Sequence, residues 1–453
     1  MIGRINILKM NVLPKFLYLF HSIPLGPPIN FFSKMKSMFC NFIWNNRRAR
    51  LRLSLLNLPY DRGGLKLPNL QWYYWAAQLA AASCWFSQGS PQSWMSMERT
   101  MSSPLQLKSY LYSAKLKELK ALTDNPFVKN TILIWYEVHK HIGEIPILSQ
   151  FTPIWGNSDF KPEKKDMGFR IWASKGLSKI ADLFDNNILL SFVDLKQKYD
   201  IQQNHFFKYL QIRSYIFKVQ KLLALPTLSP IEKIATNLHP KRGLTASFYA
   251  LIMERSKVSS DRKRLAWCED LNSVISTEDW QKICFKSQTQ TINTHFKLLQ
   301  YKWIMRMYVT PTQLNKFNPN NPDTCYKCGR EGTLYHCLWD CPLIQAFWSE
   351  VMDMILQVTG IKLTIDPQLC ILGIFPTNYN LSKANKSMII FCMPQAKYTI
   401  AKSWKSTTKP SISVWLAGMS DSLALEKLTF TLKGKYQIFD SMWKSFMVFL
   451  EGR

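Results

Sequence analysis

The sequence has few acidic residues, and it lacks the patterns of several common catalytic centres. Lys and Arg number 58 against 30 Asp and Glu, which gives a formal net charge of +28, and the first acidic residue is Asp61. No two aspartates are adjacent, so the paired carboxylates with which a polymerase holds two metal ions are absent. Neither a G-x-x-x-x-G-K-[ST] phosphate loop nor a G-x-S-x-G nucleophile elbow is present. We therefore expect no catalytic residues and no enzymatic activity from this chain alone.

Long apolar runs and densely spaced cysteines are also missing. No apolar run reaches the ~20 residues that a membrane-spanning helix needs, and the longest candidate, residues 72–86, contains Gln78. Ten cysteines in 453 residues are sparse and follow no clean secretory segment, which argues against a disulfide framework. We expect a soluble chain of the nucleus, the cytoplasm or both, with no membrane partner. Its length suits two or three domains.

The excess of positive charge indicates a polyanionic partner, because such a field acts before any specific contact forms. Residues 1–60 contain nine Lys or Arg and no acidic residue. A mitochondrial transit peptide would share that composition, but the segment is rich in aromatic residues and patterned like folded protein. Two segments are candidates for phosphate contact, although basic clusters are often only solvated faces. Their candidate residues are Arg47, Arg48, Arg50 and Arg52 in the first, and Lys297, Lys302 and Arg306 in the second.

Four candidate metal ligands are concentrated between residues 325 and 341. Cys325 and Cys328 form a C-x2-C pair, and His336 and Cys341 follow as H-x4-C. Two such pairs supply the four ligands of a tetrahedral Zn²⁺ site, and a site closed by four protein ligands is structural rather than catalytic. Gly329 permits the sharp backbone path after the first pair.

Two alternatives accompany this zinc hypothesis. Cysteines can serve only as small apolar residues, which is our interpretation of the six that lack a close partner. Cys337 lies next to His336 in the sequence, so either could be the third ligand, and we favour His336. A short helix starting at Gly332 or Thr333 would carry both His336 and Cys341. The isolated cysteines are Cys40, Cys84, Cys268, Cys284, Cys370 and Cys392.

The hydrophobic pattern predicts a mostly α-helical protein. In residues 33–44, apolar side chains recur at helical spacing and predict one buried stripe, formed by Met35, Met38, Phe39, Phe42 and Ile43. Residues 183–199 and 205–213 give amphipathic helices that we interpret as packing faces. After the cysteine cluster we expect an apolar helix over 342–355 that covers the metal module, and short helices over 396–404 and 442–450.

Three local features of the N-terminal part predict specific structures. Pro14 should kink a helix over residues 5–20. The Gly63–Gly64 pair marks a bend, after which residues 65–67 should form a short strand. Asn69 should cap the helix that runs to about residue 86. The successive aromatics at 72–75 of that helix could stack on bases, but a second packed surface is the interpretation we favour.

Several segments, in the same order, resemble non-LTR retrotransposon reverse transcriptases of the LINE type. The N-terminal matches look like the thumb of that family, and the C-terminal ones look like its cysteine-rich segment; between about 90 and 290 the likeness is vague. They are residues 3–15 (GRINILKMNVLPK), 42–45 (FIWN), 63–69 (GGLKLPN), 310–311 (TP), the 325–341 cluster, 342–348 (PLIQAFW), 372–374 (LGI) and 400–404 (IAKSW).

The resemblance implies a thumb that grips a primer–template duplex, a helical part that braces RNA and a zinc segment that binds RNA or DNA. In the family an endonuclease and a palm with paired aspartates precede this region. Here Met1 stands where the thumb begins, so we expect a truncated copy. In the family, the first two cysteines are often separated by one residue more than Cys325 and Cys328 are here. We expect a thumb-like region over 1–88, a bracing region over 89–305, a CCHC zinc module over 306–375 and a helical tail over 376–453.

Three functions compete at this point. The first is a catalytically inactive nucleic-acid-binding protein that takes RNA, DNA or an RNA–DNA hybrid. The second is an accessory part of a reverse transcriptase completed by another chain, such as a full-length retrotransposon protein. The third is a zinc-stabilised interaction protein whose positive charge serves solubility or membrane contact.

Overall fold

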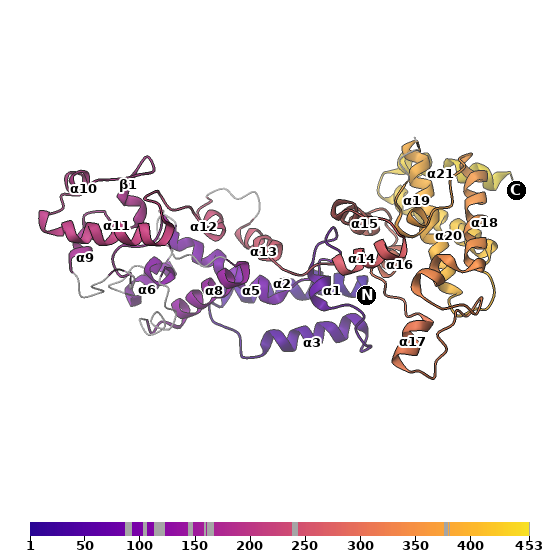
Figure 1. Cartoon of the computed structure of the whole chain (residues 1–453), viewed down its shortest axis with the longest axis horizontal. Helices are drawn as coiled ribbons and strands as arrows, with labels where there is room; N and C mark the ends of the chain where they lie inside the picture. Colours follow the sequence, from indigo (N-terminus) through magenta and orange to yellow (C-terminus); the bar gives the residue numbers. More distant parts are fainter. Residues whose placement is uncertain are drawn as a thin grey trace. The chain divides into compact units, whose positions relative to one another are not determined.

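The computed structural model is mostly helical in the parts it describes, as the hydrophobic pattern predicts (Figure 1). It describes residues 1–86, 93–102, 107–112, 123–143, 148–157, 160, 167–237, 243–375, 379 and 381–452. The boundary expected at residues 88/89 lies outside these residues, and the division into four segments stays a prediction. The chain divides into two compact units, residues 1–7, 38–67 and 258–453 in one, and residues 8–37 and 68–257 in the other.

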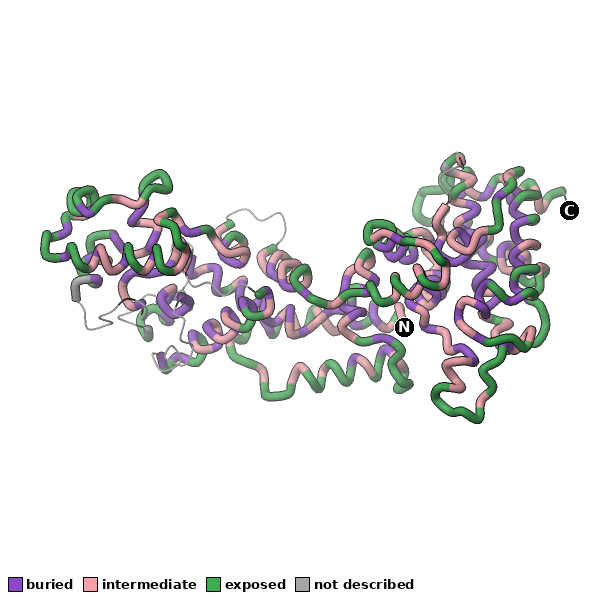
Figure 2. Tube along the Cα trace, in the orientation of Figure 1, coloured by how far each residue is buried: buried purple, intermediate pink, exposed green. Residues whose placement is uncertain are grey.

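The first unit contains the cysteine cluster and a C-terminal group of helices. Buried residues line the interior of this group, with large aromatic side chains such as Trp348, Trp415 and Trp443 fully buried (Figure 2). Its helices are α1 Ile2–Ile7, α4 Leu53–Asn57, α14 Asp261–Asp270, α15 Thr277–Thr289, α16 Thr294–Ile304, α17 Pro311–Phe317, η6 His336–Asp340, α18 Pro342–Thr359, η7 Gln368–Leu372, α19 Lys383–Lys402, α20 Ile412–Leu432 and α21 Tyr436–Glu451.

The second unit packs α2, α8 and α13 against α5, and it has a separate core around Trp172. The core around Trp172 includes a two-stranded hairpin, in which β1 pairs antiparallel with β2. Its elements are η1 Leu8–Val12, α2 Leu13–Ser22, α5 Leu70–Ala82, η2 Ser83–Phe86, α6 Ser93–Ser102, η3 Leu107–Leu111, α8 Pro126–Ile142, α9 Met167–Ser174, η4 Ile180–Leu183, β1 Phe184–Asp185, β2 Ile188–Leu189, α10 Phe192–Tyr199, η5 Gln203–His205, α11 Phe206–Gln220, α12 Pro230–Ala235 and α13 Leu244–Glu254.

Helix α5 is buried on almost every side. The side-chain oxygen of Asn69 accepts hydrogen bonds from the amides of Gln71 and Trp72, which confirms the predicted cap. Trp72, Tyr74 and Trp75 are buried, and Tyr73 stacks on Tyr249 with ring centroids 4.0 Å apart. A helix that is apolar all round is surrounded by other elements. The aromatic run therefore packs the unit, as we favoured, and it is not an open stacking surface.

The N-terminal helix is interrupted where Pro14 predicts a kink. A π-helical turn, η1, ends one residue before α2, and Pro14 occupies the first turn of α2. Proline is tolerated in a first turn, where its missing amide hydrogen is not needed.

Some local predictions are wrong. Helix α3, Phe31–Trp44, buries Phe39 and Ile43, but Met38 is 61% exposed and Phe42 is also exposed, so the buried stripe is narrower than predicted. Residues 65–67 form no strand, because the backbone of Lys66 has a φ of 55° and breaks the extended path. Leu65 and Leu67 are nevertheless both buried, as their alternation predicts.

The C-terminal helices are longer than expected, and α20 was not predicted at all. Helix α19 begins thirteen residues before the predicted start at 396 and contains Pro394. Because Gly418 of α20 has no side chain, Gln395 of α19 can lie against it, and a Cβ there would be 1.8 Å from the Gln395 amide nitrogen. Among the described residues, no helix combines the length and apolar character needed to cross a membrane.

The Gly63–Gly64 bend is fixed by close backbone contact. Gly63 has a φ of 83°, and a Cβ on Gly64 would lie 1.9 Å from the carbonyl oxygen of Leu58. Backbone atoms cannot rotate away as a side chain can, so the bend requires glycine at position 64.

We predict that Gly64→Ala lowers the free energy of unfolding by about 3 kcal/mol, at the upper end of overpacking costs. Gly3→Ala is the matched control in the same unit, since nothing lies within 4 Å of a Cβ there and alanine favours a helix by up to about 1 kcal/mol. Urea unfolding of both variants measures the difference. Equal midpoints would contradict this account of the bend.

Candidate metal centre and basic surface

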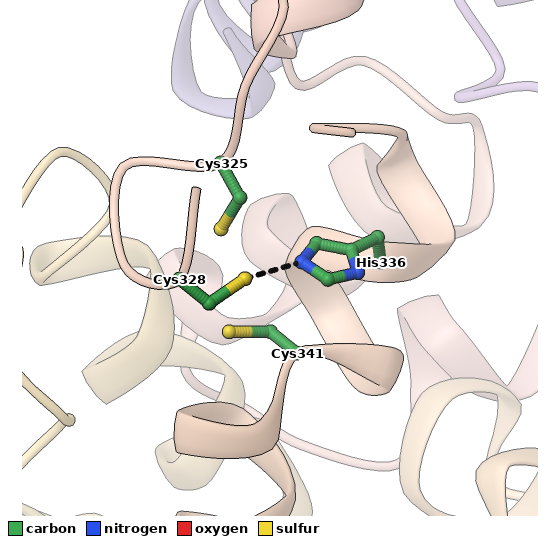
Figure 3. Close-up of side chains that lie close together, drawn as sticks. All are labelled: Cys325, Cys328, His336 and Cys341. Atoms are coloured by element: carbon green, nitrogen blue, oxygen red, sulfur yellow. Dashed lines mark hydrogen bonds between the residues drawn. The ribbon is translucent and has the colours of Figure 1, made fainter. Parts of the chain in front are cut away.

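Cys325 and Cys328 are held by a tight hairpin. Thr324 and Glu331 form an antiparallel bridge, and the amide of Cys325 donates to the carbonyl of Arg330 at 2.6 Å. The turn between them needs Gly329, whose φ of 74° lies in the left-handed region. The predicted role of Gly329 is confirmed. The hairpin thereby brings both thiols to the space that also holds the His336 ring and the Cys341 thiol (Figure 3).

His336 and Cys341 are brought together by a π-helical turn, η6. Residues five apart on an α-helix are separated by about 140° around its axis and do not share a face. In η6 the amide of Cys341 donates to the carbonyl of His336 at 3.0 Å, an i→i+5 bond that closes the wider turn. The hydroxyl of Thr333 accepts from the amide of His336, so Thr333 starts the turn, as one of the two predicted positions.

The four candidate ligand atoms converge. The thiols of Cys325, Cys328 and Cys341 and a ring nitrogen of His336 all lie within 4.8 Å of one another. One contact of 3.0 Å joins Cys328 Sγ and His336 Nε2. Zinc bonds of ~2.3 Å to sulfur and ~2.0 Å to nitrogen would place tetrahedral ligand atoms roughly 3.5–3.8 Å apart. Side-chain shifts of up to about 1 Å would meet that spacing, so these four residues could hold a metal ion.

Electrostatics separate the candidate thiols from Cys337. Burial acts to raise the pKa of Cys325, but hydrogen bonds from the amides of Lys327 and Cys328 outweigh it and lower that pKa. Burial raises the pKa of Cys341 to about 11. Burial and the neighbouring thiols, Cys325 first among them, raise the pKa of Cys337 far more. Cys337 is outside the converging set, and the choice of His336 as the third ligand agrees with the geometry.

Contacts beyond the ligands hold the centre in place. The carboxylate of Asp340 lies 3.4 Å from Nδ1 of His336, where it can orient the ring so that Nε2 faces the thiols. Lys327, inside the C-x2-C turn, donates to the carbonyls of Ser403 and Ser406, each at 2.7 Å. These bonds tie the hairpin to the end of α19.

Helix α18 starts at the centre and packs against η6. Cys341 is its N-cap residue, and the indole of Trp348 donates to the carbonyl of Leu338 at 3.1 Å. Ile344 and Phe347 of the same helix are fully buried. The apolar cover expected from residues 342–355 is confirmed, and the helix extends four residues beyond the predicted end.

The first basic segment is exposed at the C-terminal end of α3. Arg47, Arg48, Arg50 and Arg52 are all exposed. The guanidinium of Arg48 lies 5.6 Å from the ring centroid of Phe317, and Arg50 donates to the carbonyl of Met307 at 2.7 Å. Among the described residues, the side chains of Arg47 and Arg52 form no hydrogen bond or ion pair. Two guanidinium groups are thus anchored, and two are available to an anion.

The second basic segment behaves differently. The guanidinium of Arg306 is 2.5 Å from the carboxylate of Asp270 and lies over the ring of Trp267, so in this structure it stabilises the fold. Burial, and then the charge of Arg50, lower the pKa of Lys302. Lys297 is half-buried on α16. Phosphate contact by Lys297, Lys302 and Arg306 stays a prediction.

Sequence reasoning missed two residues that serve the centre. Lys327 and Asp340 lie within the cluster, but their roles depend on the position of α19 and on the π-helical turn, which the spacing of ligands does not reveal. In the sequence, only the positive charge of Lys327 could have indicated that this residue makes hydrogen bonds beside the cluster. A comparison with models of known protein families finds none that matches the chain.

We predict that Cys341→Ser reduces bound metal, because a hydroxyl is a poor substitute for a thiolate ligand. Cys337→Ser is the control and should retain about one metal ion per chain. Metal content after dialysis and proteolysis of residues 320–350, with and without a chelator, are the measurements. Metal lost from Cys337→Ser but kept by His336→Ala would assign the third ligand to Cys337 instead.

Lys327→Met should lower the free energy of unfolding by about 1–3 kcal/mol, because it removes charged hydrogen bonds to two carbonyls. Metal content should stay unchanged, since Lys327 is not a ligand. Lys362→Met, at an exposed lysine, is the control in thermal or urea unfolding. An identical stability for both variants would show that the Ser403 and Ser406 contacts contribute nothing.

Proposed function

We propose that this chain is a catalytically incomplete, retrotransposon-derived protein that binds RNA, DNA or an RNA–DNA hybrid, with Zn²⁺ as a structural element. The exposed arginine segment at 47–52 carries the proposal. Its guanidinium groups present several donors each to solvent, and Arg binds phosphate in a bidentate manner. The net charge of +28 adds a long-range attraction for any polyanion.

Zinc is the metal that the ligand set suits best. Three thiolates and one imidazole form a Cys3His set, which is typical of structural zinc sites in small modules. All four positions come from the protein, so no coordination position remains open for a substrate or a water. The proposed ion would therefore stabilise the segment and would not carry a reaction.

The likeness to LINE-type reverse transcriptases supports the choice of nucleic acid as the polyanion. It rests on the residues quoted above, in particular GGLKLPN at 63–69 and the cluster at 325–341. The absence of adjacent aspartates from the sequence supports the lack of polymerase chemistry. Metal-dependent incorporation of nucleotides by the purified chain would overturn this part of the proposal.

The decisive experiment measures binding of the full chain to a labelled RNA–DNA hybrid across a salt series. Affinity should fall steeply with salt, because bound cations on the phosphates are released. Replacing Arg47, Arg48, Arg50 and Arg52 by Ala should weaken binding to all sequences alike. The log–log slope should fall by about 2, roughly 0.9 for each of the two guanidinium groups that are available to phosphate. A loss confined to one sequence would contradict a backbone contact.

A control with the same change in charge tests the position of the contact. Lys427, Lys433, Lys435 and Lys444 are exposed on or beside α20 and α21, and their replacement by Ala also removes four positive charges. This control should change the salt slope by much less than the arginine variant. Equal effects would mean that total charge, and not the arginine segment, governs binding. Absence of salt-dependent binding in a folded, metal-loaded chain would favour a zinc-stabilised interaction protein.

A further inference from the structure

Helix α11 presents aromatic side chains to solvent, although residues 205–213 were predicted to be a packing face. Tyr209, Ile212 and Ile216 are buried, so one side of the helix does pack as predicted. On the other side, Phe207 is 79% exposed and Phe217 is 54% exposed. Exposed phenyl rings forgo the favourable transfer out of water that burial gives, so two of them on one helix indicate a surface for a partner.

The exposed face rests on a rigid base. The indole of Trp172 donates to Nδ1 of His205 at 2.8 Å, and the hydroxyl of Tyr209 donates to the carbonyl of Leu190 at 2.8 Å. Ile212 and Ile216 are fully buried in the core around Trp172. Neither Phe207 nor Phe217 belongs to that core. Their removal should therefore leave the fold of this part unchanged.

Positive charge surrounds the aromatic face. Arg213, Lys218 and Lys221 are exposed on or just after α11 and form no ion pair with any described residue. The nearby acidic groups are used locally: Asp194 caps α10 together with Ser191, and Asp200 pairs with Lys175 at 2.6 Å. The face is therefore complementary to a polyanion.

A pocket adjoins this face at the start of α11. It has a volume of about 360 Å³ and is lined by residues of α10, η5 and the first residue of α11. Phe206 forms an aromatic wall, in edge-to-face contact with Phe192 at 5.3 Å. Lys196 donates to the side-chain oxygen of Gln203 at 3.3 Å, and Gln197 is also among the lining residues. An aromatic wall with amides beside it suits a flat, polar-edged ring such as a nucleobase.

We propose that the α10–α11 face binds single-stranded nucleic acid, with bases stacked on Phe207 and Phe217 and one unstacked base in the pocket beside Phe206. Positively charged surfaces with exposed aromatic rings bind single strands in this way, because every base has a face that stacks. Phe206 and Phe217 are separated by eleven residues, or about 16 Å along the helix, the length of a few nucleotides. The inference rests on the proposed nucleic-acid function and assigns it a second site.

The test measures affinity of the full chain for a labelled 12-nucleotide single strand. Phe207→Ala with Phe217→Ala should weaken binding by at least roughly 30-fold, the lower end of the loss expected when stacking of two bases is removed. Phe285→Ala, at an exposed phenylalanine of α15, is the matched control and should change affinity less than twofold. Phe207→Trp should retain affinity, and its fluorescence should be quenched when a base stacks on the indole.

The same variants separate this inference from the proposed function. Binding of a blunt RNA–DNA hybrid should be unaffected by the phenylalanine changes, because its bases are paired. Unchanged single-strand affinity in the double variant would overturn the α11 site while leaving hybrid binding intact. Loss of hybrid binding in the arginine variant bears only on the proposed function.

Binding to vesicles of phosphatidylserine and phosphatidylcholine tests whether an anionic membrane surface, and not nucleic acid, is the partner of this face. We expect that the phenylalanine changes do not alter vesicle binding. A membrane surface would replace nucleic acid as the partner if these changes abolished vesicle binding and left single-strand affinity unaltered.

Discussion

The C-terminal part of the first unit depends on the convergence of four side chains from three separate backbone pieces. A hairpin supplies Cys325 and Cys328, a π-helical turn supplies His336, and the N-cap of α18 supplies Cys341. Hairpins of this size bury little apolar surface, so they are unstable without a further link. Helix α18, in contrast, is anchored by buried side chains against α19, α20 and α21. A bound metal would thus attach a weakly stabilised hairpin to a well-packed helical group.

Much of this centre could be predicted from the sequence, because ligand chemistry acts through residue type and spacing. The glycine turn and the start at Thr333 also follow from local rules. The π-helical turn could not be predicted, since no single residue demands i→i+5 bonding. The contacts of Lys327 likewise depend on where α19 ends, which is a tertiary property.

The fold was predictable in class and less so in detail. Periodicity identifies helices, but it cannot distinguish a fully covered face from a partly exposed one, as Met38 and Phe207 show. Both lie at positions of helical apolar spacing and yet face solvent. The strand predicted after Gly64 failed because the pattern of Leu65 and Leu67 reports burial and not backbone geometry. Helix α19 exceeded its predicted length because tertiary packing overrides the local preference against Pro394.

The net charge of the sequence likewise does not predict where in the fold the charged side chains lie. Arg306 and Arg47 count equally in the sum of +28, but Arg306 forms an internal ion pair, whereas Arg47 is exposed. Lys397 is fully buried and donates to the carbonyl of Ile371. Only the charges that remain on the surface can attract a partner, so the strength of the field is less than the formula charge suggests. The position of a basic side chain in the fold, and not its presence in the sequence, decides whether it can bind a partner or stabilises the structure.

The i→i+5 turn between His336 and Cys341 has a consequence for which changes of length the chain can accept. Loss of one residue there would restore ordinary helical bonding, and the two ligands would still share a face. Gain of one residue would rotate the thiol away from the imidazole, and no neighbouring cysteine follows Cys341 to replace it. Deletions and insertions are therefore unequal at this point in the chain. Because of the π-helical turn, the segment between His336 and Cys341 can lose one residue and keep its two ligands together, but it cannot gain one.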